Sequence, residues 1–278
     1  MIEILKSILI GIVQGITEWL PVSSTGHMLL LDELITLEVS DEFRNLFFVL
    51  IQLGSIFAVL LLFFRRLNPF SPSKTPVQKR DTLRIWGKVI VGSIPVALIG
   101  LPFNDIIEEK LMNSITVAAT LIIYGVLFIL IENANKKRKA KINSIEEMSY
   151  KTAFLVGAFQ TLSIVPGTSR SGSTILGGMI LGINRSTASE FSFFLALPAM
   201  FGASLLRLLK FILKGFSVTS AELAILIAGT LTAFAVSAVT IKFLMNFVKK
   251  HSFSAFGWYR IALGFLVLFF LYILPAIS

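Results

Sequence analysis

The hydrophobic pattern of this 278-residue chain is dominated by six long apolar segments, separated from one another by polar or charged residues. Each comes close to the roughly 20 residues that a helix needs to cross the hydrocarbon core of a bilayer. The segments are Leu46–Phe64, Ile85–Phe103, Ile115–Ile131, Phe191–Leu209, Leu223–Leu244 and Phe256–Leu274. Pro95 lies inside the second segment and predicts a kink there. The pattern predicts an all-α integral membrane protein with about six transmembrane helices.

Two further apolar segments are interrupted by polar residues and helix breakers. Ile4–Leu20 contains a glutamine and a glutamate and ends at Pro21, while Ala153–Val165 ends at Pro166 and a glycine. Short apolar returns follow them at Met28–Leu31 and Ile175–Ile183. Because each arm is too short for a good span, we expect two re-entrant helix–loop–helix hairpins. The alternative is that both interrupted segments cross the membrane completely.

The interrupted segments belong to an internal repeat. Gly11, Gln14, Pro21, Ser23 and Ser24 match Gly157, Gln160, Pro166, Thr168 and Ser169 with one residue of difference in spacing. In each half the interrupted segment precedes three uninterrupted spans. We therefore expect one membrane domain, 1–278, with repeat halves of about 1–132 and 150–278. Broken segments at corresponding places in two halves indicate a binding site at the repeat interface.

Composition and charge agree with a membrane protein. The chain is 55% hydrophobic and 15% charged, whereas soluble domains carry roughly 25% charged residues. The net charge of +9 comes largely from the two loops Arg65–Lys88 and Asn133–Lys151, which indicates cytoplasmic loops rather than a nucleic-acid surface. The absence of cysteine excludes disulfides and thiolate chemistry. We expect the first hydrophobic segment to be retained, because no basic region or cleavage site accompanies it.

The two basic loops predict the orientation. With both in the cytoplasm, the acidic connection Asp32–Arg44 lies outside, and the first hairpin enters from outside while the second enters from the cytoplasm. Opposite entry defines an inverted-topology repeat. A further acidic connection is Asn104–Asn113. Three cations, Arg207, Lys210 and Lys214, fall near the outer side and run against this assignment.

The first interrupted segment carries a concentrated polar set. We expect Glu18 to act as a general base or a metal ligand, the alternative being a structural carboxylate. His27 is a candidate acid, base or phosphate contact. Ser24 is a candidate nucleophile, and with Ser23 and Thr25 it equally suits the N-cap of a returning helix. A helix start of this kind also suits an anion.

The second interrupted segment centres on Arg170, which follows a proline and a glycine and stands among hydroxyls. Such an arginine suits an oxyanion such as phosphate. The alternative is that Arg170 pairs internally with Glu18, which would still join the two halves. Ser169, Ser171 and Thr174 are candidate substrate-binding hydroxyls beside it. An arginine, a carboxylate, an imidazole and several serines enclosed by lipid-facing helices suit hydrolysis of a phosphorylated lipid.

These motifs resemble the bacterial undecaprenyl-pyrophosphate phosphatase family, the intrinsic membrane enzymes linked to bacitracin resistance. The matching stretches are Gln14-x-x-x-Glu18, Pro21–His27, Ile51–Ser55, Pro166–Thr174 and Ala188–Ser192, so the resemblance covers nearly the whole chain. It implies removal of the terminal phosphate of undecaprenyl pyrophosphate, which recycles the lipid carrier of peptidoglycan synthesis. It also implies a multi-pass protein of the bacterial cytoplasmic membrane, often dimeric, with a site that opens toward the outer face.

The resemblance assigns site residues as well. Glu18, His27 and Arg170 correspond to the family's essential positions, with Ser24, Ser169 and Thr174 as important hydroxyls. It implies a divalent cation, Mg²⁺ or Ca²⁺, although Gln14 stands where some members have glutamate and could contribute only a neutral ligand. Two mechanisms stay open: attack by Ser24 with Glu18 or His27 as base, or attack by water with Glu18 as base. The alternative function on the same scaffold is a transporter or lipid-carrier flippase.

Overall fold

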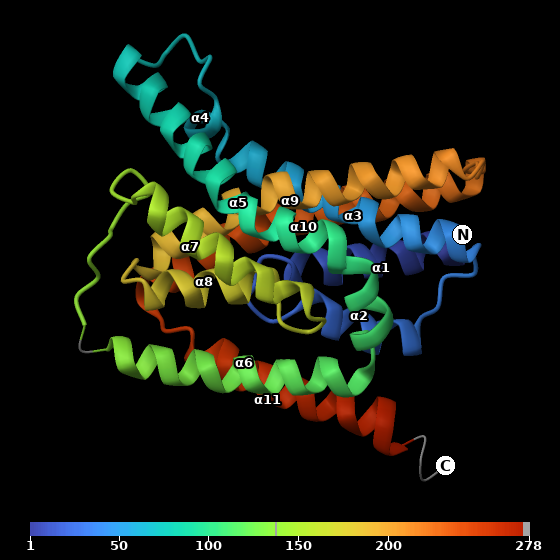
Figure 1. Ribbon diagram of the computed structural model, residues 1–278. Coiled ribbons are helices and arrows are strands. Elements are labelled where there is room, and N and C mark those ends of the chain that lie inside the picture. Colours follow the sequence, from blue (N-terminus) through green and yellow to red (C-terminus); the bar gives the residue numbers. More distant parts are fainter. Residues whose placement is uncertain (137, 275–278) are drawn as a thin grey trace.

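The computed structural model describes residues 1–136 and 138–274, and the side chains of residues 101, 104, 105 and 108 lie outside that description. The described chain is helical, and one isolated bridge between Ile142 and Ile183 is its only β-type pairing. The helices are α1 (Ile2–Thr17), α2 (Ser24–Leu34), α3 (Asp41–Leu62), α4 (Phe64–Leu67), α5 (Pro76–Leu111), α6 (Ser114–Asn135), α7 (Tyr150–Thr161), α8 (Arg170–Ile180), α9 (Arg185–Leu213), α10 (Ser220–Lys250) and α11 (Ser254–Leu268) (Figure 1). A 3₁₀ turn, Leu162–Ile164, follows α7, and a π turn, Phe269–Ile273, extends α11.

Six of these helices are long and apolar enough to cross a membrane. They are α3, α5 over Pro76–Gly100, α6, α9, α10 and α11 with its π extension. Large aliphatic side chains such as Leu98 and Val239 are exposed on them, as expected of surfaces that face lipid. The prediction of an all-α, multi-pass membrane protein with six spans is confirmed.

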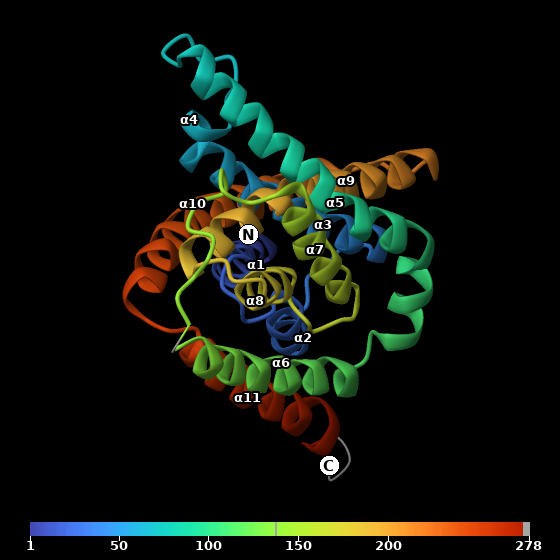
Figure 2. The same cartoon turned by 60° about the vertical axis from the view of Figure 1, so that its left-hand side comes forward.

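The boundaries predicted around α5 are wrong in detail. The expected basic loop Arg65–Lys88 contains α4 and the start of α5, which begins with a proline at Pro76. The helix then continues to Leu111, through most of the expected connection Asn104–Asn113, whose Asp105 and Glu108 side chains lie outside the described residues. Hydropathy locates apolar segments, but lysine, arginine and glutamine extend a helix well. The early part of α5 and α4 project from the bundle (Figure 2).

The two interrupted segments each form a helix–loop–helix hairpin. The first is α1 with α2, and the second is α7 with α8; α1 has 16 residues and α7 has 12. All four helices lie at the centre of the molecule, surrounded by the longer ones (Figure 2). In Figure 1 the first hairpin starts at the right, near the N-terminus, and the second starts at the left. This arrangement is consistent with oppositely directed hairpins, while their re-entry into a bilayer stays a prediction.

Each hairpin packs against a span from the other half of the chain. Helix α1 lies along α10, and α7 lies along α5. Glycines allow the close approach: a Cβ added to Gly11 would lie 2.5 Å from the carbonyl oxygen of Gly229. A Cβ added to Gly157 would overlap the backbone of Gly92. The matching glycines of the sequence repeat therefore serve the same purpose in both halves, and their backbone contacts set the depth of each hairpin.

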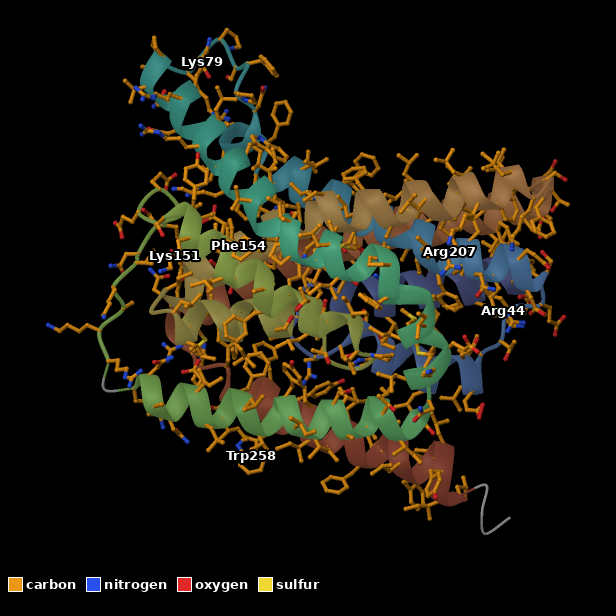
Figure 3. The ribbon with its side chains drawn as sticks, viewed as in Figure 1. Arg44, Lys79, Lys151, Phe154, Arg207 and Trp258 are labelled. Atoms are coloured by element: carbon orange, nitrogen blue, oxygen red, sulfur yellow. The ribbon has the colours of Figure 1, made fainter. Side chains whose placement is uncertain are left out.

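An ion pair with a buried carboxylate joins three spans at one end of the bundle. The fully buried carboxylate of Glu132 on α6 accepts hydrogen bonds from the guanidinium of Arg185 on α9. It also accepts one from the backbone N–H of Phe253, just before α11, at 2.8 Å. Lys79 and Lys151 lie toward this end, whereas Arg44 and Arg207 lie toward the opposite end (Figure 3). The positive-inside rule predicts that the end with Lys79 and Lys151 faces the cytoplasm.

We predict that Gly157→Ala destabilises the protein because the new methyl group meets the backbone of α5. Overpacking of this kind costs about 1–3 kcal/mol, which should lower the melting temperature measured in detergent by fluorescence-detected size exclusion. Gly202→Ala on α9 is the matched control, because no atom lies within 4 Å of its added Cβ. Equal melting temperatures for the two variants would contradict the tight crossing.

Candidate active site

The tips of the two hairpins meet at a buried ion pair. Nη2 of Arg170, the first residue of α8, donates to Oε1 of Glu18 at the end of α1, at 3.1 Å. The side chains are 12% and 9% exposed, so the pair is largely shielded from solvent. The two residues stand 152 positions apart in the chain. The expectation that the two tips come face to face is met, and the internal pairing of Arg170 with Glu18 is the form in which they meet.

Glu18 accepts two further hydrogen bonds on its second oxygen. Nε2 of Gln14, one turn earlier on α1, donates to Oε2 at 2.9 Å. The hydroxyl of Ser24 donates to the same oxygen at 3.3 Å. The carboxylate is therefore held by a guanidinium, an amide and a hydroxyl together. Its contact with Ser24 places a proton acceptor beside a candidate nucleophile.

Arg170 is positioned by the helix next to it as well as by Glu18. Its Nη1 donates to the backbone carbonyl of Ser192 on α9 at 3.0 Å. The guanidinium carbon lies 5.5 Å from the ring centroid of Trp19, which is a cation–π contact. The Nε atom is buried and has no hydrogen-bond partner. Arg170 therefore keeps unused donor capacity at the tips, which suits a group built to receive an oxyanion.

Two serines give both hairpins the same local turn. Ser23 has φ of 73° and Ser169 has φ of 71°, in the left-handed region that non-glycine residues rarely adopt. The hydroxyl of Ser23 accepts from the N–H of Gly26 at 3.4 Å, and that of Ser169 accepts from the N–H of Gly172 at 3.1 Å. Both serines are N-caps, and the starts of α2 and α8 converge on the ion pair. Two helix N-termini at one place form a favourable environment for an anion.

His27 is held by groups other than the predicted nucleophile. Its Nδ1 lies 2.7 Å from the carbonyl oxygen of Ser23 and must donate, because a carbonyl only accepts. In the neutral ring Nε2 then accepts from the hydroxyl of Tyr259, at 2.7 Å, and the two rings stack at 5.6 Å. No hydrogen bond joins His27 to Ser24 among the residues described. Of the two predicted bases, only Glu18 contacts Ser24 in this arrangement.

The remaining predicted hydroxyls lie around this cluster. Ser171 lies within 3.4 Å of the carbonyl oxygens of Glu18 and Leu20, so it ties the second tip to the first. Thr174 is fully buried, and its hydroxyl lies 2.6 Å from that of Ser192. It thus faces α9 rather than an open surface. Thr25 is half-buried on the first turn of α2.

Sequence reasoning passed over two neighbouring residues on α11, Tyr259 and Arg260. Arg260 is fully buried and donates to Pro21, Gly167 and Thr168, which belong to both tips. A signal was available, because an arginine inside the apolar segment Phe256–Leu274 is rare and usually functional. Tyr259, Ser192 and Trp19 gave no comparable signal, since hydroxyls and aromatic rings are common in membrane helices.

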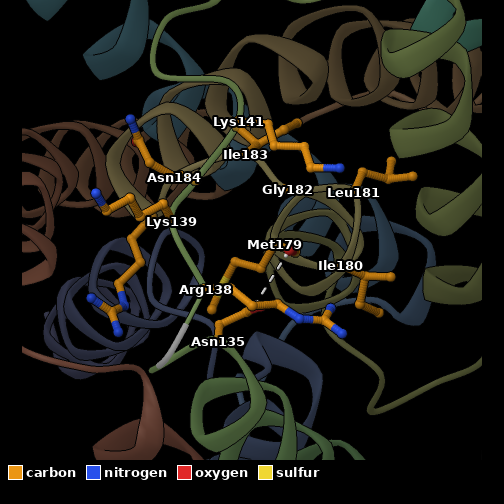
Figure 4. Close-up of a pocket in the computed structure, with 12 residues that line it drawn as sticks. Asn135, Arg138, Lys139, Lys141, Met179, Ile180, Leu181, Gly182, Ile183 and Asn184 are labelled. Atoms are coloured by element: carbon orange, nitrogen blue, oxygen red, sulfur yellow. Dashed lines mark hydrogen bonds between the residues drawn. The ribbon is translucent and has the colours of Figure 1, made fainter.

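A pocket of about 550 Å³ lies away from the tips (Figure 4). It is lined by the end of α6, the following basic loop, the end of α8 and the start of α9. A hydrogen bond from Asn135 to the carbonyl oxygen of Met179, at 3.4 Å, crosses it. The pocket shares no residue with the cluster around Glu18 and Arg170, and its size alone does not make it the active site.

Comparison with known proteins identifies the family of this chain. The model of the family described as "Bacitracin resistance protein BacA" matches residues 7–266, which include both tips. A protein named undecaprenyl-diphosphatase from Acetivibrio thermocellus is 54% identical over 270 residues, covering 97% of this chain and 98% of the relative. Proteins of the same name from Enterococcus faecalis, 54% identical over 96% of both chains, and Desulfitobacterium hafniense, 53% identical over 97% of this chain and 96% of the relative, also match. The resemblance inferred from the motifs is thereby confirmed, and this chain belongs to the BacA family.

Proposed function

We propose that the two hairpin tips hydrolyse the terminal phosphate of undecaprenyl diphosphate, giving undecaprenyl phosphate and inorganic phosphate. The products recycle the lipid carrier used in cell-wall synthesis. The observation that carries this proposal is the contact of Glu18 with both Ser24 and Arg170 inside a bundle of membrane-spanning helices. The names of the relatives, at 53–54% identity, support the same substrate.

Substrate binding falls to the second tip and the two helix starts. An oxygen of the diphosphate replaces Glu18 as the acceptor of one Arg170 hydrogen bond. The buried Nε of Arg170 supplies a further donor to the diphosphate. Backbone N–H groups at the starts of α2 and α8 contribute the rest. The hydroxyls of Ser23 and Ser169 hold these turns in shape by capping the helices. The lipid tail lies among the apolar helices that surround the tips.

The chemical step begins at Ser24. Its Oγ attacks the terminal phosphorus, its proton passes to Oε2 of Glu18, and the bond from the terminal phosphorus to the bridging oxygen breaks. Undecaprenyl phosphate leaves with the bridging oxygen. For His27 to act as the acid in this step, its ring would have to exchange a contact with Ser23 or Tyr259. Water then attacks the phosphorus of the phosphoserine, and the bond from that phosphorus to Oγ of Ser24 breaks. Glu18 returns its proton to Oγ, and phosphate leaves with the oxygen and protons of the water. The rival path is direct attack by water, with Glu18 as the base.

The residues at the tips fit a divalent cation that arrives with the substrate. Among the described residues no three histidine, aspartate or glutamate side chains gather into a metal site. One carboxylate from Glu18 and one amide oxygen from Gln14 suit Mg²⁺, which typically takes its other ligands from phosphates and water. These two residues would hold the ion, and it would neutralise charge on the phosphates during hydrolysis.

The family resemblance and the basic loops support a location in the bacterial cytoplasmic membrane. In this proposal the end that carries Lys79 and Lys151 (Figure 3) lies in the cytoplasm. The opening of the active site toward the outer face is proposed from the family resemblance alone. Membrane lipids surround the six spans. A homodimer is part of the same proposal and rests on the resemblance alone.

We predict that the protein in detergent releases phosphate from undecaprenyl diphosphate, and that Glu18→Gln and Arg170→Ala each lower kcat/KM by about 100-fold or more. Phosphate release is measured by colorimetry, and detergent removes the compartments that transport would require. The exposed residues Glu42 and Arg80 provide the controls Glu42→Gln and Arg80→Ala. Substantial activity in either tip variant, with its fold intact, would contradict the assigned roles.

Ser24→Ala separates the two mechanisms. If Ser24 is the nucleophile, acid quenching of wild type with substrate labelled in its terminal phosphate traps a phosphoserine, which the variant lacks along with nearly all activity. Intact-protein mass spectrometry and radiolabel retention detect the adduct. The exposed Ser73 provides the control Ser73→Ala. A Ser24→Ala variant with more than a tenth of the wild-type kcat would favour direct attack by water instead.

Gln14→Glu tests the cation. A second carboxylate next to Glu18 should lower the Mg²⁺ concentration for half-maximal activity by about threefold to tenfold, because added ligand charge tightens cation binding. The measurement is a Mg²⁺ titration after chelator treatment. Gln78→Glu on the exposed start of α5 adds the same charge away from the tips and should leave the titration unchanged. Identical titrations for wild type and Gln14→Glu would remove Gln14 from the cation site.

A further inference from the structure

Arg260 on α11 is a buried cation without a carboxylate partner. It is fully buried, and none of the ion pairs among the described residues includes it. Its guanidinium lies over the ring of Tyr124 at 5.6 Å, and its hydrogen bonds go to backbone carbonyls alone. Arg185, by comparison, has the buried carboxylate of Glu132 as a partner. A buried charge without its counter-ion is costly, so its persistence needs an explanation.

The carbonyls that Arg260 binds come from both hairpin tips. Nη1 donates to Pro21 of the first loop at 3.2 Å, and Nη2 donates to Gly167 and Thr168 of the second loop at 2.9 and 3.1 Å. One side chain on a third element therefore holds the two loops at a fixed separation. The loops are the segments that carry Ser24 and Arg170, so their separation decides whether nucleophile and phosphate-binding group face one substrate.

These bonds also set the direction of a backbone donor. In a trans peptide the C=O and N–H point in opposite directions, so the carbonyl of Thr168 that faces Arg260 turns the N–H of Ser169 away from it. Ser169 is the N-cap of α8, with φ of 71°. Arg260 thus stabilises the strained turn that begins this helix. Its guanidinium lies on the carbonyl side of the peptide between Thr168 and Ser169, opposite to the N–H of Ser169.

The position of Arg260 is electrostatically unfavourable until an anion arrives. A Cβ on Gly172, in the first turn of α8, would lie 3.4 Å from Nη1 of Arg260, so the guanidinium sits beside a helix N-terminus. That end of a helix is the positive end of its dipole and repels a cation. Arg170 and Arg260 together place two cations against the single carboxylate of Glu18. Within the part of the chain that the structure describes, one of these two positive charges therefore has no carboxylate partner.

We propose that Arg260 is a positioning residue that fixes the two tips against each other and supplies the unpaired positive charge that a bound diphosphate completes. The proposal rests on the proposed phosphatase function and adds to it a residue that does not contact Glu18 or Ser24. Its charge acts through the low-dielectric interior, where electrostatic interactions are stronger than in water.

The test compares Arg260→Gln, Arg260→Lys and wild type in detergent. The readouts are kcat, KM and the inhibition constant of methylenediphosphonate, a diphosphate mimic without a scissile oxygen bridge, each at a temperature where the variant is folded. Arg260→Gln should raise the inhibition constant and lower kcat/KM by about 10- to 100-fold, the usual effect of losing a charged hydrogen-bonding group. Arg260→Lys, which keeps the charge with fewer donors, should fall between Arg260→Gln and wild type.

The control is Arg185→Gln, which removes a partly exposed arginine paired with the buried carboxylate of Glu132, away from the tips. It should lower the melting temperature and leave the inhibition constant unchanged, because loss of stability alone does not weaken diphosphate binding. An inhibition constant for Arg260→Gln equal to that of wild type would overturn the proposal, and so would equal losses in Arg260→Gln and Arg260→Lys. If Arg260→Gln does not fold, Arg260→Lys decides: the proposal requires a raised inhibition constant.

The same assay separates this inference from the function on which it rests. Wild type that releases no phosphate from the lipid diphosphate contradicts the proposed phosphatase. Wild type that releases phosphate, together with an Arg260→Gln variant that binds methylenediphosphonate normally, contradicts only the role of Arg260.

Discussion

The buried ion pair between Glu18 and Arg170 is the interaction on which the rest of the site depends. Each charge would be costly alone at this depth, and each makes the other tolerable. Because the partners come from different hairpins, the pair forms only when both hairpins are folded and seated. It also leaves the carboxylate beside Ser24 and the guanidinium beside two helix starts. The same contact thus closes the fold and arranges the groups that a diphosphate needs.

The seating of the hairpins comes from packing that crosses between the halves. Helix α1 lies on α10 and α7 lies on α5, so neither half can position its own hairpin without the other. Glycines at the crossings, Gly11 with Gly229 and Gly157 with Gly92, bring backbones into direct contact. Such contacts tolerate little sliding, since a Cβ added at Gly11 or Gly157 would overlap a backbone carbonyl of the partner helix. The position of the ion pair along the bundle is therefore determined by backbone approach rather than by polar attraction.

Helix α11 adds a third support to the tips. Tyr259 holds the ring of His27, and Arg260 holds the carbonyls of both loops. These interactions support the strained turns that hold Ser23 and Ser169 in the left-handed region. Strain of this kind persists where surrounding structure over-determines it, and it is frequent at functional sites. The protein's own side chains thus fix the shape of both tips.

Hydropathy and residue type, read along the chain, were enough to predict the six spans, the two broken segments and the polar groups Glu18, Ser24 and Arg170. These features are local: an apolar run, a proline and an arginine among hydroxyls each carry their meaning within a few residues. The hydropathy pattern did not predict the start of α5 at Pro76, because charged residues extend a helix as readily as apolar ones. Only the tertiary structure decided that Glu18 faces Ser24 while His27 faces Tyr259, 232 positions away, and that Arg260 serves both tips. Those choices follow from how closely helix backbones approach and which way each helix is rotated, and both depend on packing between residues far apart in the chain.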